Sequence, residues 1–106
     1  MPSDDARSPI DFRLQRTIHV GRGGPETSGA LTVGPIRWLP ERKTWACFWS
    51  IHVIHPEEGR VFGDDPIQAL DRTFGFLADL INGSIEDGFE VWWQHKGDAC
   101  GFPPKA

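Results

Sequence analysis

Residues 63–81 read GDDPIQALDRTFGFLADLI, and they carry the clearest secondary-structure signal in the chain. Asp65 is suited to cap the first turn of a helix, and Pro66 fits the first helical position, where the missing N–H is not needed. Asn82-Gly83 is typical of a helix end. The pattern therefore predicts one helix over residues 66–82.

Apolar residues recur along this helix at the spacing of a single face. They are Ile67, Leu70, Phe74, Leu77, Ala78 and Ile81, widened by Phe76 and Leu80. We expect Leu70, Phe74, Leu77 and Ile81 to face a sheet. Gly75 lies between them, so the pattern predicts that a strand approaches the helix closely at this residue.

The segments on both sides of the helix alternate with a period of two, which predicts strands. The expected strands cover residues 10–20, 30–39, 45–55, 60–62 and 89–95. The 45–55 segment, WACFWSIHVIH, is apolar on both parities, as in a central strand. The 30–39 segment changes parity across Gly34-Pro35, which predicts a bulge. Because proline lacks a ladder donor, the segment is also expected to be an edge strand or an edge-facing part of one.

Consecutive strands joined by short turns favour an antiparallel arrangement. The predicted fold class is α+β, an antiparallel meander of four to six strands with one long helix packed on one face. Residues 10–103 are expected to form a single domain. Residues 1–9, MPSDDARSP, have no periodicity and are expected to be a disordered N-terminus.

Composition limits the function classes. The chain of 106 residues has 11 basic and 15 acidic side chains and a net charge of −4, which argues against nucleic-acid binding. No apolar run is long enough to cross a membrane, and the first residues do not resemble a secretory signal. We therefore expect a cytoplasmic protein. The abundance of arginine, glycine, proline and alanine suggests a bacterial source.

The residues that commonly carry chemistry form no recognisable motif. The histidines, which are His19, His52, His55 and His95, lack metal-ligand spacing. Cys47 and Cys100 are expected to be free thiols in a reducing compartment, with a disulfide between them as the alternative. The sequence thus predicts no catalytic residue, no cofactor and no metal, and it favours a non-catalytic role without excluding an enzyme.

Five tryptophans and no tyrosine are unusual in a chain of this length. Large rings either fill a thin core or mark a partner surface. Trp49, Trp92 and Trp93 are the candidates for a partner surface. The face that the helix leaves uncovered is expected to include Arg13, Gln15, Thr17 and His19 from the first strand. A mixed polar and aromatic patch of this kind suits protein recognition better than catalysis.

Two segments resemble a family of small bacterial domains of unknown function. Residues 63–70, GDDPIQAL, match its helix opening, Gly-x-Asp-Ser/Pro-x-Gln-Ala-Leu. Residues 91–103, VWWQHKGDACGFP, match its tryptophan-containing strand and its ending, which is similar to Gly-Asp-x-Gly-Phe. The resemblance implies an antiparallel sheet that precedes the helix, and a bacterial origin. It implies no particular activity, cofactor or site residue.

Two functional hypotheses follow from these observations. The first is a non-catalytic protein-interaction or regulatory module, with a homodimer as one form of it. Because one helix covers only one face of a sheet, we expect a large apolar surface on the other face, where it or an adjacent edge strand meets the partner. The competing expectation is that the N-terminal segment or the loop at residues 21–29 folds back and covers this surface. The alternative is a small enzyme or ligand-binding domain with a polar pocket between helix and sheet. Its candidate residues are His52, His95 and Asp98.

Overall fold

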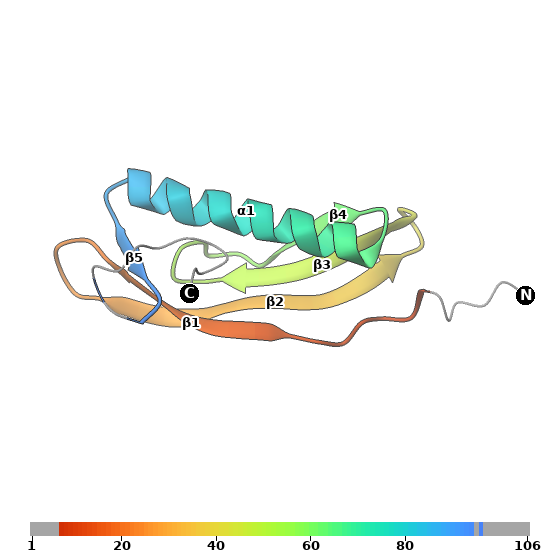
Figure 1. Ribbon diagram of the computed structural model, residues 1–106, viewed down its shortest axis with the longest axis horizontal. Helices are drawn as coiled ribbons and strands as arrows, with labels where there is room; N and C mark the ends of the chain where they lie inside the picture. The colour runs from red at the N-terminus through yellow and green to blue at the C-terminus, as the bar shows by residue number, and fades with distance from the viewer. Residues whose placement is uncertain (1–6, 95, 97–106) are drawn as a thin grey trace, which may run out of the picture.

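A computed structural model of the chain describes residues 7–94 and residue 96 (Figure 1). The elements follow the order β1 (Leu14–Gly21), β2 (Thr27–Leu39), β3 (Thr44–Ile51), β4 (Gly59–Gly63), α1 (Pro66–Glu86) and β5 (Glu90–Trp92). The fold is α+β with one helix in the described part of the chain, which confirms the predicted class.

All five strands form one antiparallel sheet in the spatial order β4-β3-β2-β1-β5. The first four strands form a meander, and α1 then crosses one face of the sheet from the β4 edge to the β5 edge. Figure 1 shows α1 above this face, and none of the described helices or strands lies below the other face. The predicted meander with one covering helix is confirmed.

The bulge predicted at Gly34-Pro35 is present, but the edge position predicted for this strand is wrong. The pairing of β2 with β3 shifts its register between Val33 and Ile36, whereas β2 is the middle strand of the sheet. Proline is tolerated there because the β1 ladder ends at the Leu14–Val33 pair, and neither ladder pairs Pro35. Beyond the bulge, the N-terminal segment takes over as the neighbour through two backbone hydrogen bonds between Ile10 and Ile36, of 2.9 and 3.1 Å.

The helix begins as predicted and ends later than predicted. Asp65 caps it, since its Oδ1 accepts a hydrogen bond from the Gln68 backbone N–H at 2.8 Å. The helix continues through Asn82-Gly83 to Glu86. A glycine inside a helix costs only about 1 kcal/mol relative to alanine, so the pair does not force a stop. The left-handed residue that follows the helix is Gly88, with φ of +98°.

The buried face of α1 is rotated from the predicted one. The fully buried positions are Ala69, Thr73, Leu77 and Ile81. The prediction that Leu77 and Ile81 face the sheet is therefore confirmed. Leu70 and Phe74 are partly buried and pack against the edge of the core. The prediction that Ile67 belongs to this face is wrong, because Ile67 is 80% exposed. The sequence pattern missed Thr73, which is tolerated in the core because its hydroxyl donates to the Ala69 carbonyl at 2.7 Å.

The close strand approach predicted at Gly75 is also wrong. Gly75 is exposed, and a Cβ added to it would meet nothing within 4 Å. We therefore expect Gly75→Ala to raise the free energy of unfolding, by up to about 1 kcal/mol, because alanine has the higher helix propensity. Urea titration of the two proteins measures the difference. A loss of stability would show that this helix face is covered.

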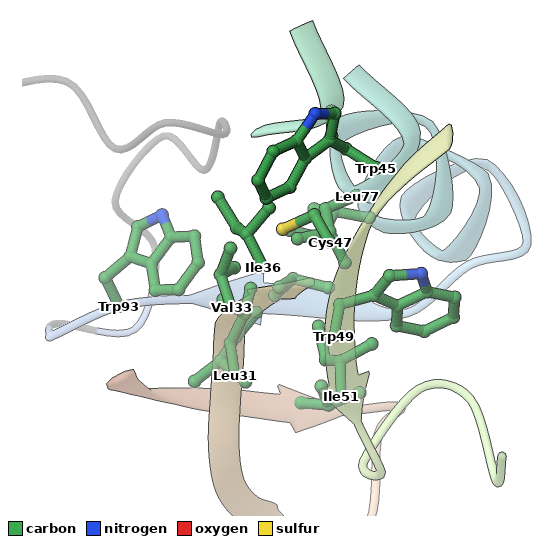
Figure 2. Packing of buried hydrophobic residues seen from close by; sticks show 14 residues of the cluster. Leu31, Val33, Ile36, Trp45, Cys47, Trp49, Ile51, Leu77 and Trp93 are labelled. Carbon is green, nitrogen blue, oxygen red and sulfur yellow. The ribbon is translucent and has the colours of Figure 1, made fainter. Parts of the chain in front are cut away.

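The core lies between α1 and the sheet. Figure 2 shows Leu31, Val33 and Ile36 of β2 beside Trp45, Cys47, Trp49 and Ile51 of β3, with Leu77 of the helix packed against them. Trp93 closes one side of this cluster (Figure 2). Because side chains alternate along a strand, the intervening residues project from the other face of the sheet.

Candidate binding surface on the open face of the sheet

We call the face of the sheet opposite α1 the open face. Its side chains include Gln15, Thr17 and His19 from β1, Thr32 and Arg37 from β2, Phe48 and Ser50 from β3, Arg60 and Phe62 from β4, and Trp92 from β5. Most of these side chains are polar, and the two phenylalanines are half-buried. The expectation of a large apolar surface on this face is therefore wrong, because most large apolar rings of the sheet lie on the helix side.

A groove of about 560 Å³ crosses the open face. Its polar lining comes from Arg13, Gln15, Thr32, Arg37, Ser50 and Glu58. The bulge residues Gly34 and Pro35 and the β3 residues Phe48 and Trp49 complete its lining, although the indole of Trp49 packs in the core on the helix side of the sheet (Figure 2). A second hollow of about 260 Å³ shares Phe48 and Glu58 with the groove and reaches Arg60 on the edge strand.

The strand register explains where the groove lies. Gln15 pairs with Thr32 and Thr32 pairs with Ser50, so a polar row runs across three strands. Glu58 precedes Gly59, the partner of Trp49, and continues this row toward β4. On the adjacent stretch of β2, Gly34 and Pro35 occupy positions from which a longer side chain would otherwise project. The bulge therefore leaves a hollow beside a row of hydrogen-bonding groups, a role that bulges often have at binding sites.

The charges in the groove are only partly compensated. Nη2 of Arg37 lies 3.2 Å from Oδ1 of Asp11, in an ion pair whose side chains are 45% and 69% exposed. Oε1 of Glu58 lies 4.0 Å from Nε2 of His52. Arg13 forms no ion pair or hydrogen bond with the described part of the chain. An exposed guanidinium offers a fork of N–H donors that matches a carboxylate.

Acidic side chains are concentrated on and around the helix instead. Residues 64–87 contain six acidic residues and one basic residue, a net charge of −5. Because the whole chain carries −4, the remainder carries +1. The groove thus lies in the more positive part of an acidic protein.

The β5 end of the open face is closed by stacked rings. His19 stacks on Trp92 with ring centroids 5.6 Å apart and planes 14° apart. Nδ1 of His19 lies 2.6 Å from the Ser28 hydroxyl. Nζ of Lys96 lies 5.6 Å from the centroid of Trp92 and forms an ion pair with Glu26 at 3.2 Å. These contacts cover Trp92, which is only 4% exposed.

The three tryptophans expected at a partner surface are all buried. Trp49 and Trp93 are on the helix side of the sheet and are 5% and 8% exposed, whereas Trp92 is on the open face beneath His19 and Lys96. The sheet therefore separates them, and they do not form one exposed aromatic patch. The parity of the strands is the physical reason, since adjacent residues 92 and 93 point to opposite faces.

The polar pocket expected between helix and sheet finds no support at His52. This residue is exposed in the turn after β3, with Nδ1 3.2 Å from the Pro56 carbonyl oxygen. His95 and Asp98 lie outside the described residues. Core side chains from the helix and the sheet pack together under α1 (Figure 2). The groove lies on the opposite face of the sheet from the one expected for a pocket.

Within residues 7–94 and 96, no three potential metal ligands come together. Cys47 is a buried free thiol on the helix side of the sheet; Cys100 lies outside the described residues. Burial raises the pKa of Cys47 above its ordinary value of 9.0, while hydrogen bonding with Thr73 and with the Gly34 backbone acts in the opposite direction.

We expect Cys47 to resist alkylation while the protein is folded. In a Cys100→Ser variant at pH 8, iodoacetamide should modify Cys47 at least about tenfold more slowly than in urea, since the thiol is buried and its thiolate disfavoured. The stability that depends on this neutral thiol is complete below pH 9.0 and declines as the pH rises toward the higher folded pKa. Mass spectrometry measures the rates, and equal rates would place Cys47 at the surface.

Comparisons with protein-family models, with curated proteins and with solved structures give no match. Among the described residues, no helix combines the length and the apolar character needed to cross a membrane. The groove on the open face is therefore the feature that bears on function.

Proposed function

We propose that this domain is a non-catalytic interaction module that binds a protein partner on the open face of its sheet. One observation carries the proposal: a polar groove that crosses several strands and presents a guanidinium, that of Arg13, without an ionic partner in the described chain. Gln15, Thr32 and Ser50 lie on paired strands, so backbone pairing holds these groups in place, and Arg13 directly precedes β1. We propose a bacterial cytoplasm as the setting, as the sequence predicts.

The chemistry of the groove favours binding over catalysis. Its polar lining consists of two arginines, an amide, two hydroxyls and one carboxylate. Arginine stays protonated in proteins, so it cannot act as a general base. A lone carboxylate beside hydroxyls and an amide lacks the paired acid and base that most hydrolytic mechanisms need. These groups can hold and orient a partner through hydrogen bonds and charge.

The size of the groove also supports a second candidate, a small ligand. A volume of about 560 Å³ is within the range of roughly 300–1,000 Å³ that is usual for small-molecule sites. Such a ligand would occupy the open face rather than the helix–sheet interface. The protein partner remains the first proposal, because the hollow continues toward β4 and the open face extends well beyond it.

The proposal is tested by capturing partner proteins on variants that carry the same change in charge at different positions. Wild type, Arg13→Glu and Arg22→Glu are each immobilised, and proteins retained from bacterial extracts are compared. Arg22 lies in the β1–β2 loop outside the groove. We expect at least one protein to be retained by wild type and by Arg22→Glu but not by Arg13→Glu. After purification, this protein should cross-link to residues of the groove. Retention of every bound protein by Arg13→Glu would contradict the proposal.

A homodimer is one form of the proposed interaction. Sedimentation equilibrium at tens of micromolar measures it directly. A homodimer that uses the open face should weaken in Arg13→Glu and remain in Arg22→Glu. A dimer that both variants leave unchanged would assign the contact to another surface.

A further inference from the structure

We infer that the groove is specific for an extended, acidic segment of a protein partner, with one of its carboxylates bound by Arg13. This inference rests on the proposed function, since it names the chemistry of the segment that the open face would bind. It follows from three features of the groove: its charge, its direction across the strands and its apolar floor.

The charge of the groove favours an acidic occupant. Arg13 and Arg37 line it, Arg60 lines the hollow that continues it, and Glu58 is the one acidic side chain in either lining. Arg37 already contacts Asp11, whereas Arg13 does not contact any charged group of the described chain. A carboxylate brought to Arg13 therefore forms a new bidentate pair without breaking an existing one.

The direction of the groove favours an extended segment. Its polar row runs from Gln15 over Thr32 and Ser50 to Glu58 and so crosses the sheet perpendicular to the strands. Three strand spacings of about 4.8 Å give a span of roughly 14 Å, which about four residues of an extended chain cover. The hydroxyl of Ser50 has no hydrogen-bond partner in the described chain, so it can donate to a carbonyl of such a segment.

The floor of the groove adds an apolar contact. Phe48 is half-buried between the two hollows, and Pro35 lies beside it on β2. In an extended segment, alternate side chains point the same way. A segment in which acidic and apolar residues alternate can therefore place a carboxylate at Arg13 while apolar side chains approach Phe48.

The probe is a blocked octapeptide of alternating glutamate and valine, measured by isothermal titration calorimetry. Two matched peptides carry glutamine or lysine in place of every glutamate. We expect binding of the glutamate peptide to weaken at least tenfold when glutamine replaces glutamate. We expect it to weaken at least fivefold in Arg13→Gln and to stay unchanged in Arg22→Gln. Raising the salt concentration should weaken it further, because exposed charges are screened.

Three results would overturn the inference. They are equal binding of the glutamate and lysine peptides, an affinity for the glutamate peptide that Arg13→Gln leaves unchanged, and no binding of the glutamate peptide at all. Circular dichroism of each variant verifies the fold, so a loss of binding is not mistaken for unfolding. If the acidic peptide does not bind while capture of a protein still depends on Arg13, this inference fails and the proposed function stands. If capture is independent of Arg13, the proposed function fails.

Discussion

Replacing Leu77 by alanine is expected to lower the free energy of unfolding by about 2–5 kcal/mol, the range for a buried leucine truncated in a core. Leu77 is fully buried at the centre of the helix face, against the β2 and β3 side chains in Figure 2. Domains of this size are stable by about 5–15 kcal/mol, so the change removes a large part of the total. Urea denaturation of both proteins measures it.

Ile67→Ala is the matched control. This isoleucine is in the same helix and was expected on the same face, but it is 80% exposed. Its truncation should change stability by less than about 0.5 kcal/mol, as is usual at exposed positions. The opposite ranking of the two variants would mean that the helix is rotated relative to the sheet.

Gly34→Ala is expected to destabilise the protein by at least about 2 kcal/mol, because two effects combine at this residue. Its φ of +105° is a conformation that other residues rarely adopt. An added Cβ would also collide with the carbonyl oxygen of Phe12. Since Gly34 lines the groove, the variant should also bind the glutamate peptide more weakly under conditions in which it remains folded.

Gly23→Ala separates the two effects. Gly23 has a φ of +66°, but an added Cβ would have no neighbour within 4 Å. Only the cost of the left-handed conformation applies there, about 1–2 kcal/mol. Thermal denaturation should therefore place Gly34→Ala below Gly23→Ala. Equal melting temperatures would show that the N-terminal segment does not pack over the bulge.

Local signals in the sequence were sufficient for much of the fold. The cap at Asp65 and the proline after it located the helix start, and the parity change across Gly34-Pro35 located the bulge. The errors concern tertiary context. Asn82-Gly83 is a typical helix end, yet the helix continues to Glu86. Proline suggested an edge strand, yet the two ladders next to Pro35 both leave it unpaired.

The rotation of the helix shows another limit of sequence patterns. The predicted apolar face included Ile67 and excluded Thr73. Hydropathy alone does not show that a threonine hydroxyl can form its hydrogen bond within the helix, so Thr73 was not expected in the core. In the structure Thr73 is buried, with its hydroxyl hydrogen-bonded to the Ala69 carbonyl, and Ile67 is exposed. A threonine four residues after a buried alanine is a weak signal that could have indicated this.

The candidate site was only partly predictable. Alternation placed Arg13 and Gln15 on the uncovered face, and the structure puts both in the groove. The contributions of Thr32, Ser50 and Glu58 depend on the register between strands, which the sequence does not specify. The three tryptophans were more conspicuous, but large rings stabilise a thin core as readily as they mark a surface.

The most direct test of the open-face groove follows backbone amide signals by NMR while wild-type protein is titrated with the glutamate–valine octapeptide. We predict that the largest shifts belong to Gln15, Thr32 and Ser50, and that the signals of Asp71 and Asp79 on the helix change little. Saturable shifts confined to the groove would support an acidic segment on the open face. Shifts concentrated on the helix, or no shifts at millimolar peptide, would contradict it.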